Sequence, residues 1–248
     1  MEQKITLQIW YLTIKNFKSM IRDKAQLVWL IGYPLLFMVL YRFAFEEVVF
    51  ALMAPGLLVA GPTIIISQLA QHFAEEKELG TLQRLDTTPV SRNTILISGL
   101  LSQLIIGVIQ IALFLILIFV FTIGNPEVIH PDANLFLMFF IPFLVTFSSL
   151  GFGLLLASFV KTGGSASGIA WFIILPLQFL GGVITYPAFL PFIPTGLAVD
   201  ALRSVMSFEF FGSLTSGEVV LNMIYILIWG VAVSLLGMIL FQRKTAIL

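Results

Sequence analysis

The sequence predicts an all-α, polytopic membrane protein. Of its 248 residues, 59% are hydrophobic and only 10% are charged, and the mean hydropathy is +1.04. A soluble domain of this length needs more charged side chains to cover its surface. The apolar residues also fall into long runs, and a helix that spans a bilayer needs about 20 of them in a row. We therefore expect residues 1–248 to form a single transmembrane domain.

The composition excludes several classes of function. The formal net charge is zero and there is no basic tail, so nothing indicates a nucleic-acid partner. The lack of cysteine excludes disulfides, thiolate metal sites and cysteine nucleophiles. The first apolar run begins only near Leu27, after a charged segment, which argues against a cleavable signal peptide at the start of the chain.

Residues 1–26 are predicted to form an amphipathic helix at the membrane interface. One stripe of this helix is polar and mostly basic, and a second stripe is apolar. The polar stripe consists of Lys4, Gln8, Tyr11, Lys15, Lys18 and Arg22, and the apolar stripe of Leu7, Trp10, Ile14, Phe17 and Ile21. A helix of this kind lies in the plane of the interface, and we expect its basic side to face the lipid phosphates.

Six membrane-spanning helices are predicted after this segment. The expected spans are Leu27–Tyr41, Val48–Ala70, Ile95–Ile123, Leu135–Val160, Gly168–Tyr186 and Val219–Phe241. The uncharged stretch after Lys161 is too long for one span and contains Pro187, Pro191 and Pro194. Non-helical backbone at membrane depth persists only where it is buried in protein or faces water. Residues 187–210 are therefore predicted to form a re-entrant segment that enters the membrane and turns back.

Orientation is predicted from Lys and Arg in the connecting segments, because these residues are enriched on the cytoplasmic side. With six spans, eleven of the 13 Lys and Arg residues fall on one side. They are Lys4, Lys15, Lys18, Arg22, Lys24, Lys77, Arg84, Arg92, Lys161, Arg243 and Lys244. Only Arg42 and Arg203 fall on the other side. Both termini and residues 75–92 are therefore expected in the cytoplasm, with the protein in a cell membrane.

Residues 75–92, EEKELGTLQRLDTTPVSR, form a polar segment between two apolar spans. Leu79, Leu82 and Leu85 recur at i, i+3 and i+6, which predicts a short helix with one apolar face along the membrane surface. The acidic residues before it are Glu75, Glu76 and Glu78, where negative charge suits the N-terminal region of a helix. The leucines either contact a soluble partner or pack back on the bundle.

The end of this segment carries two further signals. Thr88 precedes Pro89, and a residue before proline is disfavoured in the α region, so the short helix should end there. Ser91 can then cap the third span, because a serine side chain accepts a hydrogen bond from a free N–H of a helix start.

Two motifs resemble those of the type-2 ABC exporter permeases. The family carries a Glu-rich run, then Gly-Thr-Leu, then a Thr-Pro-Val-Ser-Arg-like end. The matching residues are Glu75, Glu76, Glu78, Gly80-Thr81-Leu82 and Thr88-Pro89-Val90-Ser91-Arg92. The stretch PTGLAVDALR, residues 194–203, is similar to a Pro-Leu-Thr-Tyr-Ala-x-x-Ala-Leu-Arg segment before the family's last span. Gly181-Gly182-Val183 with Pro187 and Pro191 resembles its re-entrant element, and the similarity extends over the whole chain.

The resemblance implies that the short cytoplasmic helix is a coupling helix, which docks on a separate ABC ATPase subunit. The residues expected to act in this coupling are Glu75, Glu76, Glu78, Leu79, Gly80, Thr81, Leu82, Arg84, Leu85, Thr88 and Pro89. No G-x-x-x-x-G-K-[ST] phosphate loop occurs in the sequence. ATP and Mg²⁺ are therefore expected on the partner subunit, and this chain is expected to bind no cofactor and catalyse no reaction.

Six spans are expected to make half of a pore, so the resemblance also implies a dimer with a second permease copy or a paralogue. The function that follows is that of the permease subunit of an ATP-driven ABC exporter, in a family that resembles exporters of drugs, lipids and polysaccharides, and the sequence does not identify the substrate. The residues expected at an external gate are Pro187, Pro191, Pro194, Asp200 and Arg203. Asp200 and Arg203 are i, i+3 neighbours, so they either act in gating or simply pair with each other.

Small and polar residues inside the spans predict helix contacts. Gln103, Gly107 and Gln110 share one face of the third span, which we expect to meet another helix or the transport pathway. Buried amides elsewhere should also find partners, and they are Gln68, Gln71, Gln178 and Asn222. Gly164 and Gly168 form a small-xxx-small pair at the start of the fifth span, which favours close helix approach.

The remaining residues argue against several other functions. His72 and His130 should lie about 30 Å apart, a full hydrocarbon thickness, so they cannot share a metal and no metal site is expected. An ATP-independent secondary transporter or channel would need ionisable residues inside the spans, which are nearly absent. A membrane enzyme has no catalytic set, and an accessory protein that binds an ATPase without transport remains an alternative.

Overall fold

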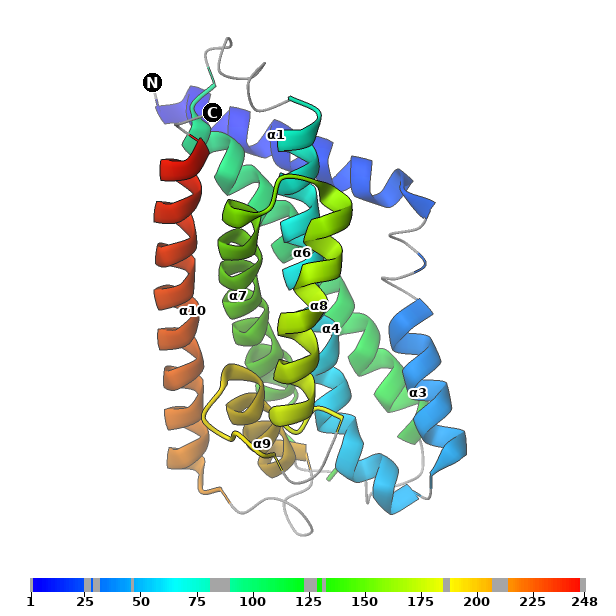
Figure 1. Ribbon diagram of the computed structural model, residues 1–248. Helices are drawn as coiled ribbons and strands as arrows, with labels where there is room; N and C mark the ends of the chain where they lie inside the picture. Colours follow the sequence, from blue (N-terminus) through cyan, green and yellow to red (C-terminus); the bar gives the residue numbers. More distant parts are fainter. Residues whose placement is uncertain are drawn as a thin grey trace.

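The computed structural model describes residues 2–24, 28, 32–45, 47–80, 90–122, 129–130, 133–184, 188–206 and 214–245. Within these ranges the regular structure is helical throughout, which confirms the all-α prediction (Figure 1). The elements are α1 (Glu2–Arg22), α3 (Tyr33–Ala44), α4 (Glu47–Glu78), α6 (Arg92–Thr122), α7 (Leu135–Phe159), α8 (Gly163–Leu180), α9 (Pro194–Met206) and α10 (Ser216–Thr245).

Five of these helices, α4, α6, α7, α8 and α10, are long and apolar enough to cross a membrane. By contrast, α3 has 12 residues, which span about 18 Å at the helical rise, short of the roughly 30 Å hydrocarbon core. Part of the predicted first span, Leu27–Tyr41, lies outside the described residues, so the sixth span stays a prediction. The two chain ends lie at the same end of the bundle (Figure 1), as an even number of crossings requires.

The second and fifth predicted spans differ most from the structure. The second span was expected to end at Ala70, whereas α4 continues for two more turns to Glu78. The fifth was expected over Gly168–Tyr186, whereas α8 begins at Gly163 and ends at Leu180. Polar residues at these helix ends find partners inside the chain, described below, and hydropathy alone does not register such contacts.

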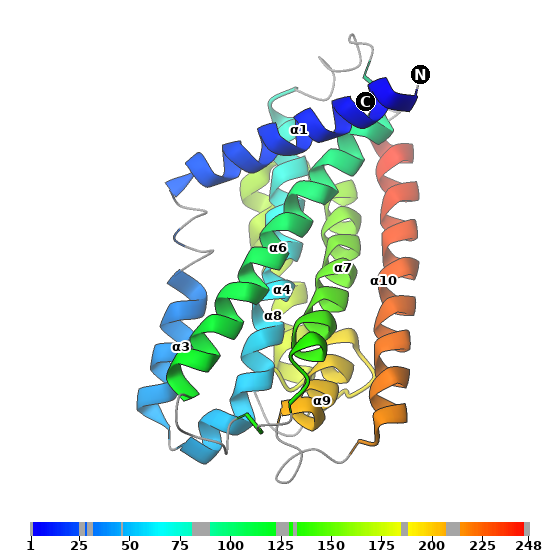
Figure 2. The same ribbon diagram turned by 180° about the vertical axis from the view of Figure 1, so that it is seen from behind.

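Helix α4 is the central element of the bundle (Figure 2). Its most apolar window is 83% buried inside the molecule, against 28% for the windows of α8 and α10. It passes through Pro55 and Pro62 without interruption. Next to Pro62, the Gln178 amide of α8 donates to the Thr63 hydroxyl at 2.8 Å and to the Ala60 carbonyl at 3.4 Å. Such contacts from neighbouring helices allow proline in membrane helices.

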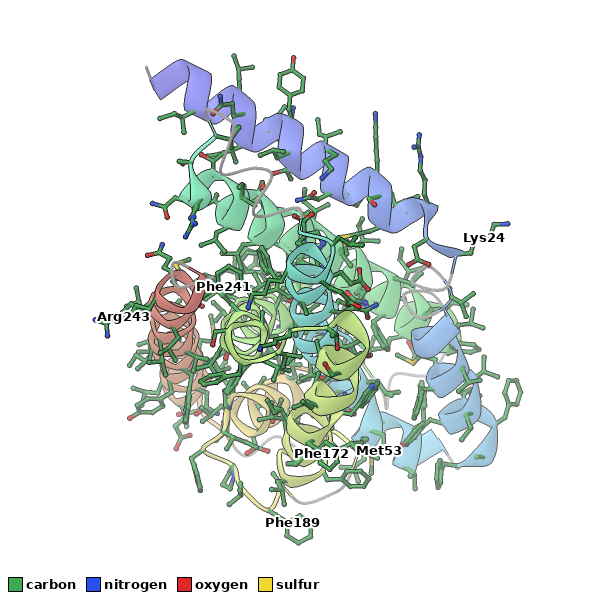
Figure 3. The ribbon with its side chains drawn as sticks, turned by 45° about the horizontal axis from the view of Figure 1, so that its top comes forward. Lys24, Met53, Phe172, Phe189, Phe241 and Arg243 are labelled. Carbon is green, nitrogen blue, oxygen red and sulfur yellow. The ribbon has the colours of Figure 1, made fainter. Side chains whose placement is uncertain are left out.

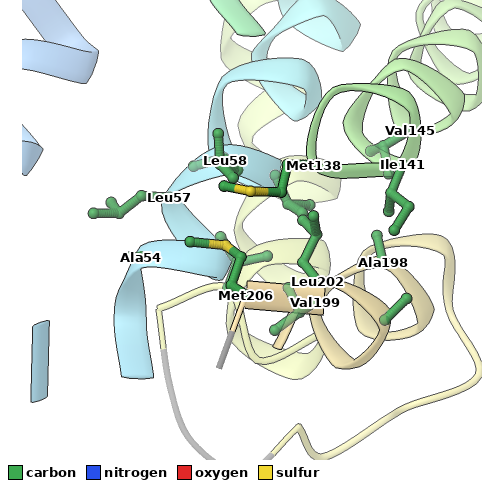
Figure 4. Close-up of a cluster of buried hydrophobic side chains, with 14 of the residues drawn as sticks. Ala54, Leu57, Leu58, Met138, Ile141, Val145, Ala198, Val199, Leu202 and Met206 are labelled. Atoms are coloured by element: carbon green, nitrogen blue, oxygen red, sulfur yellow. The ribbon is translucent and has the colours of Figure 1, made fainter. Parts of the chain in front are cut away.

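The largest hydrophobic core joins α4, α7 and α9 (Figure 4). Its members include Ala54, Leu57 and Leu58 of α4, Met138, Ile141 and Val145 of α7, and Ala198, Val199, Leu202 and Met206 of α9. All of α9 is buried apart from Asp200. This short helix is therefore fixed by packing at the end of the bundle opposite the chain termini (Figure 1).

Helix α1 lies across the end of the bundle that holds the chain termini (Figure 2). Its buried residues are Thr13, Asn16 and Met20, which lie on neither predicted stripe. The Thr13 hydroxyl donates to the Ser98 carbonyl of α6 at 3.5 Å, and Met20 contacts the amide of Gln103. The apolar stripe is largely open to the surroundings, with Leu7, Trp10 and Ile21 exposed. A third, narrow face of α1, which carries Thr13, Asn16 and Met20, therefore packs against the bundle.

Candidate coupling and gating sites

The three glutamates of the predicted coupling motif lie in the last two turns of α4. Sequence reasoning placed them before a separate short helix, but they belong to the end of a long one. Helix α4 is closed by a Leu79 N–H to Glu75 carbonyl bond of 2.9 Å, and Gly80 follows with φ of 64°. That left-handed conformation is favoured by glycine and ends many helices. The other coupling residues, Thr81, Leu82, Arg84, Leu85, Thr88 and Pro89, lie outside the described residues.

Each glutamate has a partner within the chain. Glu75 accepts a 2.7 Å hydrogen bond from the Gln71 amide one turn earlier. Glu76 lies 3.9 Å from the ammonium of Lys15 on α1. Glu78 accepts a 3.0 Å hydrogen bond from the N–H of Gly163, the first residue of α8. Glu75 and Glu76 are half-buried, whereas Glu78 and Leu79 are exposed, Leu79 to 69%.

The predicted cap of the third span is confirmed. The Ser91 hydroxyl accepts a 3.2 Å hydrogen bond from the Thr94 N–H at the start of α6. It also lies 2.8 Å from the Thr94 hydroxyl. The end of α4 and the start of α6 are therefore both defined on either side of residues 81–89.

The residues predicted to form a gate gather at the opposite end of the bundle, around α9. After α8 the chain turns through Gly181 and Gly182, and the Leu190 N–H returns to the Leu180 carbonyl at 2.8 Å. The Thr195 hydroxyl donates to the Leu177 carbonyl at 2.7 Å. Pro191 and Pro194 lie in this connection and at the start of α9, while Pro187 lies outside the described residues.

Arg203 is a buried cation on α9. It donates from Nη2 to the Gly182 carbonyl at 3.1 Å and lies 3.5 Å from Asp200, the pairing expected from their spacing. Burial raises the pKa of the Asp200 carboxyl, and the charge of Arg203 opposes this rise. The guanidinium thus joins α9 to the turn after α8.

The 13 residues of α9 span about 20 Å, which is too short to cross a bilayer. The depth of α9 in the membrane stays a prediction.

The polar face of α6 packs against neighbouring helices, which is one of the two alternatives predicted for it. Gln103, Gly107 and Gln110 are buried. A Cβ on Gly107 would lie 2.5 Å from Thr146 of α7 and 2.6 Å from Ile65 of α4. Within the part of the chain that the structure describes, both polar atoms of the Gln110 side chain lack a hydrogen-bond partner.

The family model for the ABC-2 type transporter matches residues 7–207. This match covers most of the chain, from α1 through α9. The chain belongs to the ABC-2 type transporter family. Comparison with individual curated proteins gave no match. The membership makes this protein a multi-pass ABC transporter permease, and it agrees with the resemblance carried by the motifs between α4 and α6 and at α9.

The glycine pair at the start of α8 faces away from the rest of this permease. A Cβ on Gly164 or on Gly168 would meet no atom within 4 Å. The same outward face carries Phe172, which is 82% exposed (Figure 3). The expected close approach of a helix to these glycines is therefore not made by any described helix of the same chain.

The two histidines of the permease lie in unrelated surroundings. The His72 ring packs beside Phe73, with 5.3 Å between ring centroids. The backbone N–H of His130 donates to the Met206 carbonyl at the end of α9. Among the described residues, no three His, Cys, Asp or Glu side chains converge as metal ligands would.

Sequence reasoning missed Lys77 as a site residue. Its ammonium donates to the Ala157 carbonyl of α7 at 2.5 Å and lies 4.6 Å from the ring centroid of Phe241 on α10. A single lysine among glutamates resembles a solvated residue, and its partners are distant in sequence. The only available signal was its position in a motif that the family resemblance had already marked.

Proposed function

We propose that this chain is the membrane-spanning subunit of an ATP-driven ABC exporter, coupled to a separate ATPase subunit. The match of the ABC-2 type transporter family to residues 7–207 carries this proposal. ATP and Mg²⁺ bind the partner, and closure of two such partners pushes residues 79–85 and thereby moves α4 and α6. The pathway then opens past α9 at the far end. Export as the direction, in a cell membrane with cytoplasmic termini, follows from the motif resemblance.

The geometry at the end of α4 supports this assignment. The predicted coupling segment connects two spanning helices, since α4 ends at Glu78 and α6 begins at Arg92, so a push on it would act on both. Leu79 exposes an apolar side chain at that end, and an exposed leucine beside a charged loop suits a contact with a soluble protein.

A second permease copy or a paralogue would complete the pore. The outward face of α8 supports this role, because Gly164 and Gly168 leave room for another helix to approach closely. The protein lacks native cysteine, so Gly168→Cys would be its only thiol. We expect this variant to form a disulfide-linked dimer in membranes, whereas Leu235→Cys, at an exposed position on α10, should form no disulfide-linked dimer.

Recovery of the tagged chain from its native membranes in a gentle detergent tests the proposed function. The recovered material is analysed by mass spectrometry and assayed for ATP hydrolysis. We expect an ABC ATPase in about equal amount, which Leu82→Asp and Leu79→Asp should remove. Leu135→Asp is the matched control, because Leu135 is exposed at a helix start on the opposite end. Intact protein without an ATPase would favour an ATP-independent carrier.

A further inference from the structure

The end of α4 binds the ends of two other helices at the point where the chain reverses between them. Helix α7 ends at Phe159 and α8 begins at Gly163. Lys77 donates to a carbonyl in the last turn of α7, at 2.5 Å. Glu78, the next residue, accepts the N–H of Gly163 at 3.0 Å. One turn of α4 therefore contacts both helices of the reversal.

The charges of these two side chains match the helix ends that they contact. The last carbonyls of a helix and its first N–H groups have no partner within the helix. The helix dipole also favours a cation at the C-terminal end and an anion at the N-terminal end. Lys77 supplies the cation and Glu78 the anion. Thr162, at the cap position of α8, makes no capping hydrogen bond with its own side chain, so α4 supplies this cap.

Packing holds the same elements in close contact. A Cβ on Gly163 would lie 2.4 Å from Cγ of Glu75, so the first residue of α8 rests directly against α4. Lys77 also lies over the ring of Phe241, which is almost fully buried. The contact with α1 is longer, with the ammonium of Lys15 3.9 Å from the Glu76 carboxylate; the Lys15 side chain is 58% exposed and that of Glu76 is 16% exposed. A salt bridge whose cation is largely exposed to solvent contributes little stability.

We propose that Lys77 and Glu78 are positioning residues that hold α4, α7 and α8 as one rigid unit at the cytoplasmic end. A displacement of the segment after Gly80 is then carried to α7 and α8 together with α4, while α1 moves relative to them. This inference rests on the proposed function, since it names the residues through which the push of the ATPase spreads into the bundle. It also assigns the charged residues of the motif an internal role.

A double-cysteine variant, Glu75→Cys with Gly163→Cys, tests whether the unit stays closed during turnover. Because Cγ of Glu75 is 2.4 Å from a Cβ on residue 163, the two Cβ atoms are at most about 4 Å apart, within the range of a disulfide. We expect equal disulfide yields in the nucleotide-free complex and in the complex trapped with ATP and vanadate. The oxidised and reduced forms should hydrolyse ATP at the same rate. A yield that falls on trapping, or hydrolysis restored only by reductant, would overturn the rigid unit.

Single substitutions test whether these side chains transmit the push. Glu78→Ala and Lys77→Met should keep the ATPase bound but reduce its hydrolysis to the rate of the ATPase without permease. Glu78→Gln, which retains an acceptor oxygen, should recover part of the loss. Glu218→Ala is the matched control, because Glu218 accepts the Thr215 N–H at 2.7 Å before α10, at the other end. It should lower the Tm to a similar extent and leave hydrolysis unchanged.

The outcomes separate the two proposals. If the unaltered chain recovers no ATPase, the proposed function fails and the role in transmission fails with it. If the ATPase is recovered and Glu78→Ala hydrolyses ATP like Glu218→Ala, the proposed function stands and the positioning role is wrong.

Discussion

Polar side chains bind backbone groups of other elements at both ends of the bundle. Lys77 of α4 donates to the Ala157 carbonyl of α7 at one end. Arg203 of α9 donates to the Gly182 carbonyl in the turn after α8 at the other end. In an apolar environment an unpaired polar group is costly, so such contacts specify position more strictly than apolar contacts do.

Replacement of Arg203 should therefore release the turn after α8. Arg203→Met removes the donor to the Gly182 carbonyl and leaves Asp200 without the cation beside it. We expect a loss of roughly 2–3 kcal/mol in the free energy of unfolding, because one partner of a buried pair remains. Unfolding in detergent measures this loss. Arg243→Met, at an exposed position near the end of α10 (Figure 3), should change little; equal effects would refute the assignment.

Gly56 is a second position where the packing leaves no room for an added Cβ atom. A Cβ there would lie 2.1 Å from the carbonyl oxygen of Val183, and this neighbour is backbone that cannot rotate away. Gly56→Ala should push the turn after α8 away from α4 and cost about 1–3 kcal/mol. Gly217→Ala is the control, since its Cβ would meet only Thr215 at 4.0 Å. Thermal unfolding of both variants compares them, and a neutral Gly56→Ala would contradict the contact.

At the scale of elements, α7 and α10 approach closely through glycine. A Cβ on Gly151 would lie 2.7 Å from the Ser234 nitrogen, and a Cβ on Gly237 would lie 3.0 Å from the Gly151 carbonyl oxygen. Close backbone approach through small residues gives membrane helices their packing energy. The close approach of the two helices therefore depends on glycine at these positions.

A larger residue at this contact should separate the two helices. We expect Gly151→Val to lower the Tm of the purified protein by several degrees and to make α10 accessible to protease, because the added methyl groups meet backbone. Ala232→Val places the same side chain on the exposed face of α10 and should be tolerated. If both variants unfold alike, glycine does not set this interface.

The elements themselves were largely predictable, because hydropathy and length decide which segments can cross a bilayer. The cap at Ser91 was also predictable from local chemistry. The end of α4 was not, since Glu and Lys are good helix formers but the span was assigned by apolarity alone. The docking face of α1 escaped notice because Thr13, Asn16 and Met20 form neither an apolar nor a charged stripe. The partners of these residues are distant in the sequence, so no local sequence pattern indicates the contacts.

At the scale of the whole molecule, the two clusters of polar contacts lie at opposite ends of one bundle. The contacts of Lys77 and Glu78 lie at the end with the chain termini, and the α9 contacts lie at the other end (Figures 1 and 2). Helix α4, the most buried of the five candidate spans, connects them. A movement of its end can therefore reach the predicted gate through a continuous helix, the kind of rigid element through which coupling travels.

This arrangement predicts a definite orientation in the membrane. Helix α10 has 30 residues, about 45 Å, enough to cross a bilayer with its headgroups. In the cysteine-free chain, a membrane-impermeant maleimide on intact cells should label Phe189→Cys and Ser216→Cys, whose native residues are exposed near α9. Lys18→Cys and Arg243→Cys should react only after permeabilisation, because most Lys and Arg side chains lie at that end. Labelling of Arg243→Cys alone would invert the orientation, and labelling at both ends of α10 would show that it does not span.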